Sequence, residues 1–128
     1  MHVIYNPNPE GNRPIDCTVR AITKLTGRKW EDVYIQLSLH GLILGDMPNK
    51  NYVWGSYLKS EGYERYIIPN DCPACYTVSQ FAAEHPAGEY LLALDGHVVT
   101  VCDGDWYDTW DSGNEVPLYY WKKGDINV

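Results

Sequence analysis

The chain has 128 residues, the usual size of a single domain, and its 45% hydrophobic and 21% charged residues are typical of a globular protein. Ten basic and seventeen acidic residues give a net charge of −7, which repels phosphate backbones and argues against nucleic-acid binding. No apolar run is long enough to cross a bilayer, and the first residues lack the pattern of a secretion signal. We therefore expect residues 1–128 to form one cytoplasmic domain without a membrane or nucleic-acid partner.

The first half of the chain has the residue spacing of helices. Asp16 is a suitable N-cap for a helix over residues 16–26, in which apolar side chains recur every four positions. Similar patterns predict a second helix that begins at Trp30 and ends at Gly41, and a third over residues 51–62. Helices are thus expected to dominate this half.

The second half predicts an antiparallel sheet. A strand over residues 63–68 comes first, and a capping box at 77–80 begins a short helix that ends at His85. Asp-Gly pairs at 95–96 and 103–104 favour two-residue hairpin turns. Strands are expected over 90–94, 97–102, 105–110 and 118–122. Helices followed by an antiparallel sheet make an α+β fold.

The residues with the clearest chemistry are Cys17, His97 and Asp108, although each alone is also compatible with ordinary packing. A thiol at a helix N-terminus is favoured as thiolate, and it needs a base within reach and a group that orients the base. If the turn at 103–104 has two residues, the numbers of any two paired residues in this hairpin add up to 207. Asp108 then lies on the same face of the sheet as His97, diagonally across from it on the neighbouring strand. Asp111 would take that place only if the loop had an odd length.

These residues and their neighbours resemble the compact bacterial or phage-borne members of the papain-like cysteine peptidases. The resemblance covers about residues 6–122 and implies an α+β papain-like fold, a peptide or protein substrate and no cofactor. It implies that Cys17 is the nucleophile, His97 the general base and acid, and Asp108 the residue that orients His97. The segments that carry it are Asp16-Cys-Thr-Val-Arg-Ala-Ile22, Gly96-His-Val-Val-Thr-Val101 and Trp106-Tyr-Asp-Thr-Trp-Asp111.

The same resemblance implies an oxyanion donor, usually a Gln about six residues before the nucleophile. Gly11 stands there, so the neighbouring Asn12 is expected to donate together with the backbone N–H of Cys17. Asp16 places a negative charge beside the thiol, which opposes ionisation unless Arg20 neutralises it. The spacing of Asp16 and Arg20 suits an ion pair on one helix face.

A second cysteine pattern, Cys72-Pro-Ala-Cys75, has the spacing of a redox dithiol or of half a zinc site. A zinc ion would need further ligands, for which His85 or Cys102 is available. In a thioredoxin-like fold the dithiol begins a helix, whereas the capping box starts the helix at Thr77, after both cysteines. We therefore favour loop cysteines without a catalytic role or a local disulfide, with redox and zinc sites as alternatives.

The sequence thus predicts a hydrolase that cleaves peptide or isopeptide bonds through a thioester on Cys17. The same residues also suit acyl transfer, because a thioester can react with an amine in place of water. The competing class is a non-enzymatic domain that binds a partner through its aromatic surface, since the chain has 11 Tyr and 5 Trp.

Overall fold

The structure, a computed structural model, describes residues 1–69 and 75–124 and belongs to the α+β class, as predicted. Within these residues it has four helices and one sheet of six strands. The helices are α1 (Cys17–Thr26), α2 (Trp30–Leu44), α3 (Asn51–Ser60) and α4 (Val78–Glu84). The strands are β1 (His2–Ile4), β2 (Tyr63–Ile67), β3 (Glu89–Leu94), β4 (His97–Cys102), β5 (Asp105–Asp108) and β6 (Pro117–Lys123).

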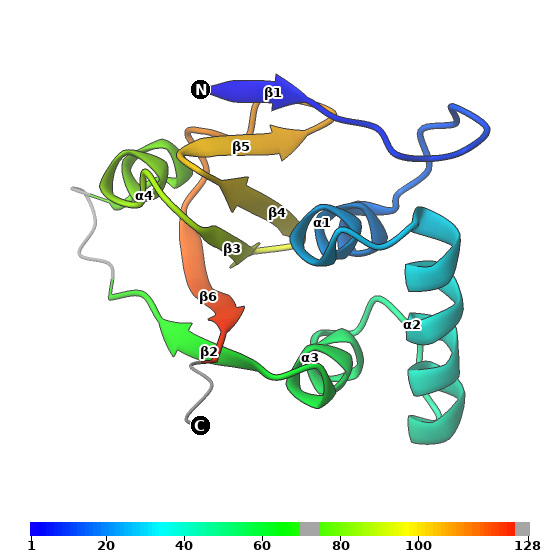
Figure 1. Ribbon diagram of the computed structural model, residues 1–128. Coiled ribbons are helices and arrows are strands. Elements are labelled where there is room, and N and C mark those ends of the chain that lie inside the picture. Colours follow the sequence, from blue (N-terminus) through cyan, green and yellow to red (C-terminus); the bar gives the residue numbers. More distant parts are fainter. Residues whose placement is uncertain (70–74, 125–128) are drawn as a thin grey trace.

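The strands lie in the order β1-β5-β4-β3-β6-β2, and all neighbours are antiparallel except β1 and β5 (Figure 1). The β4–β5 hairpin has the predicted register, because Thr100 pairs with Tyr107. Its turn residues, Asp103 at φ 49° and Gly104 at φ 82°, both have the positive φ that a two-residue type I′ turn requires. Strand β5 ends at Asp108 rather than at the expected Trp110.

Helix α2 is longer than its sequence pattern predicts, because Gly41 does not end it. The helix runs to Leu44, and the left-handed residue that follows is Gly45, at φ 72°. Gly41 is buried where the chain turns back, and a Cβ atom there would lie 2.6 Å from the carbonyl oxygen of Asp46. The expected helix end at Gly41 is therefore wrong, since this glycine allows close packing of backbone on backbone.

Helices α1, α2 and α3 lie on one side of the sheet and α4 on the other (Figure 1). The hydroxyl of Thr100 donates to the carbonyl of Ala21 at 2.6 Å, which fixes α1 against β4. None of the helices within 1–69 and 75–124 is long and apolar enough to cross a membrane. The larger core cluster, between the sheet and α1–α3, includes Ile22, Leu25, Leu37, Trp54, Tyr57, Leu91 and Trp121. The smaller, under α4, includes Val78, Phe81, Leu92, Val99 and Val101.

Candidate active site

Cys17 is the first residue of α1, and its side chain is half-buried at the edge of a cleft. The partial positive charge of a helix N-terminus favours a negatively charged sulfur at this position. Asp16 precedes it at the N-cap position, as predicted, but its carboxylate makes no capping hydrogen bond. The carboxylate instead accepts from Arg20 Nη1 at 2.6 Å and from Trp30 Nε1 at 3.0 Å.

His97, the first residue of β4, lies between Cys17 and Asp108. Its Nε2 is 2.6 Å from Asp108 Oδ2, and the imidazole lines the same cleft as Cys17 and lowers the pKa of its thiol by hydrogen bonding and charge. Because Nε2 is engaged by Asp108, Nδ1 is the ring nitrogen left for the sulfur. The Trp110 ring packs beside the imidazole, with ring centroids 4.9 Å apart. The structure therefore brings together the three residues that the sequence pattern singled out.

The carboxylate of Asp108 is completely buried and is surrounded by hydrogen-bond donors. Its Oδ1 accepts from Arg20 Nη2 at 2.8 Å and from the Thr109 backbone N–H at 2.9 Å. Its Oδ2 accepts from the Ser112 hydroxyl at 2.8 Å, in addition to its contact with His97. A buried charge is costly unless it is hydrogen-bonded, and these contacts satisfy both oxygens. They also hold one oxygen in place against the imidazole.

The three groups shift each other's pKa values toward an ion pair. Burial favours the neutral imidazole, but hydrogen bonds to Asp108 and to Cys17 outweigh burial and raise the pKa of His97 to about 9. Burial also favours the neutral thiol, but the hydrogen bond and charge of His97, with the backbone N–H of Val98, lower the pKa of Cys17. Burial is likewise outweighed at Asp108, where the hydrogen bond and charge of His97 lower the carboxyl pKa. All three shifts therefore favour the charged forms, which are the thiolate, the imidazolium and the carboxylate.

Groups of alternating charge form a series that runs from the buried Asp16, Arg20 and Asp108 to the half-buried His97 and Cys17. The side chain of Arg20 is 5% exposed and spans both carboxylates. The ion pair predicted between Asp16 and Arg20 is therefore present, and it offsets the negative charge beside the sulfur. The second contact of Arg20, with Asp108, cannot be predicted from the spacing of residues along the sequence.

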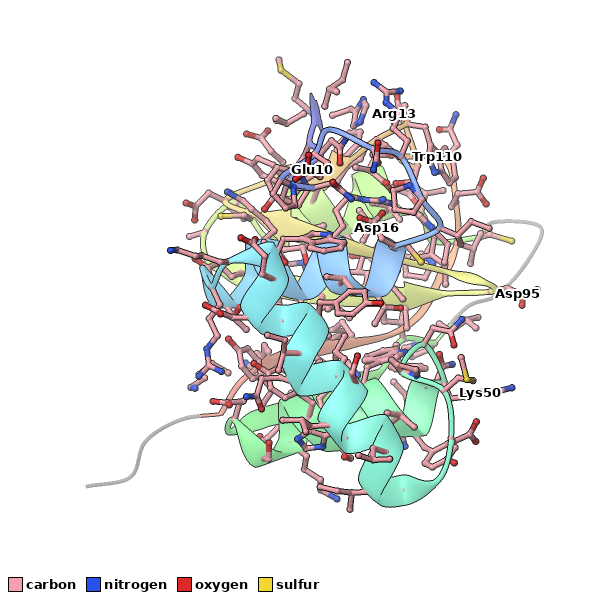
Figure 2. The ribbon with its side chains drawn as sticks, turned by 90° about the vertical axis from the view of Figure 1, so that its right-hand side faces the viewer. Glu10, Arg13, Asp16, Lys50, Asp95 and Trp110 are labelled. Carbon is pink, nitrogen blue, oxygen red and sulfur yellow. The ribbon has the colours of Figure 1, made fainter. Side chains whose placement is uncertain are left out.

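A cleft of about 630 Å³ borders Cys17 and His97. Figure 2 shows this side of the molecule, with Asp16 at the start of α1, Trp110 above it, Asp95 at the hairpin tip and Lys50 below. The wall beyond the sulfur is mainly apolar, which suits an acyl or side-chain group of low polarity. Six of its apolar residues are Trp30, Tyr34 and Leu37 of α2, Met47 and Pro48 of the following loop, and Leu94 of β3.

Asn12, the expected oxyanion donor, is exposed and lines the same cleft as Cys17. Its backbone carbonyl accepts from Asn6 Nδ2 at 3.1 Å, which ties the segment before α1 together. Asn8 also lines the cleft, although the sequence pattern did not single it out. Its Oδ1 accepts from the Glu10 backbone N–H at 2.9 Å, so that side chain supports the loop.

The second cysteine pattern is described only in part, since Cys72 lies outside the described residues. Cys75 is disulfide-bonded. His85 Nδ1 is 2.7 Å from the Phe81 carbonyl oxygen, and Cys102 is a free thiol. Over 1–69 and 75–124, no three His, Cys, Asp or Glu residues are grouped to hold a metal ion. The helix start at Thr77 is confirmed, with both capping-box hydrogen bonds formed.

Two further side chains belong to the site, and only one of them could have been predicted from the spacing of residues in the sequence. Ser112 lies four residues after Asp108, close enough for a local hydrogen bond to be expected. Trp30, which binds Asp16, comes from the start of α2, and only the packing of α1 against α2 brings it there. No protein-family model, curated protein or solved structure matches this chain. The geometry alone therefore defines the site, which can support attack by a thiolate on an electrophilic carbon.

Proposed function

We propose that the protein is a cysteine-dependent hydrolase that cleaves peptide or isopeptide bonds through a papain-like active site. The observation that carries this proposal is that buried Asp108 bonds His97, and that His97 lines the same cleft as Cys17 and lowers the pKa of its thiol. A thiol nucleophile needs a base within reach and a third group that orients the base, and both are present. The apolar cleft beside the sulfur offers room for the acyl part of a substrate.

The fold supports a papain-like arrangement in particular. The nucleophile begins helix α1, the histidine begins β4, and the acidic residue ends the neighbouring strand β5. Their order along the chain, Cys17, His97 and Asp108, is the order of the family that the sequence resembles. Helix α1 thus presents the sulfur beside the antiparallel β4–β5 hairpin, which carries the other two groups.

In the first half of the reaction the Cys17 thiolate attacks the carbonyl carbon of the bond to be cleaved. A C–S bond forms, and the carbonyl π electrons move onto oxygen, which accepts hydrogen bonds from the Cys17 backbone N–H and the Asn12 amide. When the intermediate collapses, the C–N bond breaks and the leaving nitrogen takes the proton of the His97 imidazolium. The products of this half are a free amine and a thioester on Cys17.

In the second half, water hydrolyses the thioester. Neutral His97 takes a proton from water as its oxygen attacks the carbonyl carbon, and the C–S bond then breaks. The carboxylic acid leaves, and the thiolate and imidazolium are restored. Asp108 keeps Nε2 of the imidazole engaged and stabilises its positive charge, so that Nδ1 stays toward the sulfur. An amine in place of water would give acyl transfer by the same steps.

The test of this proposal combines alkylation of Cys17 with peptide cleavage. The protein is treated with iodoacetamide near neutral pH, and modified cysteines are located by mass spectrometry. A second sample is incubated with a library of proteome-derived peptides. We expect Cys17 to react well before Cys102, whose pKa is raised by burial and by the charge of Asp103. We expect the library to be cut, and Cys17→Ala to abolish cutting.

The matched pair of variants is His97→Ala and His40→Ala. His40 bonds Ser56 at 2.9 Å and is not among the residues that line the cleft of Cys17. His97→Ala should slow both alkylation and cleavage, and His40→Ala should slow neither. Alkylation of Cys17 that is indifferent to His97→Ala, with no peptide cut by the wild-type protein, would contradict the enzyme and favour the partner-binding alternative.

A further inference from the structure

A second groove, of about 740 Å³, lies between α3 and the strands β2 and β6. Helix α3 contributes Tyr52, Ser56 and Lys59, strand β2 contributes Arg65, and strand β6 contributes Tyr119 and Trp121. None of these six side chains takes part in the chemistry proposed for Cys17. The groove therefore needs its own explanation.

The second groove and the cleft of Cys17 share one lining residue. Asn51, the first residue of α3, lines both cavities. The Oδ1 atom of Asn51 accepts from Trp54 Nε1 at 3.2 Å, so its amide N–H groups remain to donate to a ligand. A chain that extends from the cleft of Cys17 past Asn51 would enter the second groove.

The aromatic walls of the second groove are held in place by packing. A Cβ atom on Gly55 would lie 3.2 Å from Trp121 Cζ2, so this glycine lets α3 pack directly on the indole. The guanidinium of Arg65 lies over the ring of Tyr119, 5.2 Å from its centroid. Flat, fixed rings with polar groups between them suit an extended peptide.

The charge of the second groove is opposite to that of the whole protein. Lys59 and Arg65 are exposed, and neither forms an ion pair with a carboxylate over residues 1–69 and 75–124. Glu64 is the acidic residue in the lining, and its carboxylate already accepts from the Tyr66 hydroxyl at 2.7 Å. Two cations against one engaged carboxylate, in a chain of net charge −7, make a local site for an anionic group.

We propose that the second groove binds the part of a peptide substrate that continues beyond the cleft of Cys17. In this proposal, which rests on the proposed function, Arg65 and Lys59 select an acidic side chain of the substrate. The apolar cleft then accepts an apolar residue near the cleaved bond. The substrate class is a peptide segment with an apolar residue at the bond and an Asp or Glu at a fixed distance from it.

The experiment is digestion of a proteome-derived peptide library by the wild-type protein and by the double variant Lys59→Gln/Arg65→Gln. The wild type should cut peptides enriched in Asp or Glu at one fixed position, as well as in apolar residues near the bond. The double variant should lose the acidic preference and keep the apolar one. For one cut peptide and its Glu→Gln analogue, the wild-type ratio of kcat/KM should be roughly fivefold to tenfold and should fall to about 1 in the variant.

The control is Lys24→Gln/Lys29→Gln, which removes the same charge from residues that do not line the groove. It should keep the acidic preference, and iodoacetamide should alkylate Cys17 at equal rates in all three proteins. A library that is cut without acidic preference, or with one that survives Lys59→Gln/Arg65→Gln, overturns the groove proposal and leaves the hydrolase standing. A library that the wild type does not cut overturns the hydrolase, and the groove proposal with it.

Discussion

Arg20 Nη2 lies 2.8 Å from Asp108 Oδ1, in an ion pair that joins α1 to the end of β5 and is almost wholly buried on both sides. Removing one partner of a buried pair leaves an uncompensated charge, which usually costs about 3–5 kcal/mol. Arg20→Leu would leave two buried carboxylates, Asp16 and Asp108, without their shared cation. We expect it to lower the free energy of unfolding by about that amount, measured by urea denaturation.

The control for this prediction is Arg28→Leu. Arg28 pairs with Glu61 at 3.0 Å, but its side chain is 43% exposed, and exposed pairs contribute about 0–1 kcal/mol. Its loss should therefore change the free energy of unfolding much less. Equal effects of Arg20→Leu and Arg28→Leu would mean that the buried ion pair does not stabilise the fold.

The second prediction concerns the charge of Asp108. Arg20, Thr109 N–H and imidazolium His97 all donate to its two oxygens, so an amide NH₂ in place of either oxygen would face a donor. Asp108→Asn should therefore disfavour the imidazolium and lower kcat for peptide cleavage by roughly 10³–10⁴-fold. The carboxylate of Asp108 is so embedded that Asp108→Ala should also destabilise the fold, which the sequence alone did not suggest.

Asp111→Asn is the comparison for Asp108. Asp111 Oδ1 accepts from Trp106 Nε1 at 2.9 Å and from the Gly113 N–H at 3.0 Å, and an amide oxygen can accept both. The kcat of the Asp111→Asn variant for peptide cleavage should therefore stay close to that of the wild type. A large loss with Asp111→Asn and little with Asp108→Asn would reverse the assignment of the orienting carboxylate.

Sequence patterns predicted the parts of this site that depend on local geometry. A two-residue turn at 103–104 fixes the hairpin register, so the proximity of His97 and Asp108 followed from parity alone. The start of α1 at Cys17 followed from apolar spacing within one helix. In both cases the interacting residues are close along the chain, or are linked through one turn.

Other parts of the site depend on packing between distant segments, which spacing does not encode. Arg20 and Asp108 are 88 residues apart, and only the seating of α1 on the sheet brings them together. Strand β1 has three residues, His2–Ile4, too few for an alternating pattern to be recognised, yet it pairs in parallel with β5. Gly41 was misjudged for the same reason, because its role is set by the loop that packs on it.

The pH dependence follows from the shifted pKa values. Because the pKa of Cys17 is lowered, the thiolate should persist below the ordinary thiol range, and alkylation by iodoacetamide should stay fast at about pH 6.5. Because the pKa of His97 is raised to about 9, its proton should be lost as the pH rises through that value. Peptide cleavage, which needs the imidazolium proton for the leaving amine, should therefore decline above about pH 9.

His97→Ala provides the comparison for the pH profile. A thiol with an ordinary pKa near 8.5 is only about 1% ionised at pH 6.5, although its thiolate is intrinsically more nucleophilic. The variant should therefore react about tenfold or more slowly with iodoacetamide at that pH, and the gap should narrow in alkali. Identical alkylation profiles for both proteins would mean that His97 does not activate the thiol.

The fourth prediction concerns Cys75. Cys72, the other cysteine of the same motif, lies outside the described residues. The helix that follows begins at the Thr77 capping box, which forms its hydrogen bonds without either cysteine. Cys75→Ser should therefore leave the alkylation rate of Cys17 unchanged, whereas Thr77→Ala should lower the free energy of unfolding by about 1 kcal/mol. Thiol–disulfide exchange that is lost with Cys75→Ser but survives His97→Ala would place the chemistry at the second motif.

The last prediction concerns Asn12 as oxyanion donor. It lines the cleft beside Cys17, and its amide has a role only once charge develops on the substrate oxygen. Asn12→Ala should therefore lower kcat for a cut peptide by about 10²–10³-fold, with little change in KM, since such a donor acts mainly on the transition state. Iodoacetamide forms no oxyanion, so alkylation of Cys17 should not change.

Asn8→Ala is the control, because Asn8 lines the same cleft but its Oδ1 supports the loop. A fall in kcat with Asn8→Ala and none with Asn12→Ala would assign the donor to Asn8, and a fall with neither would leave the oxyanion to backbone N–H groups.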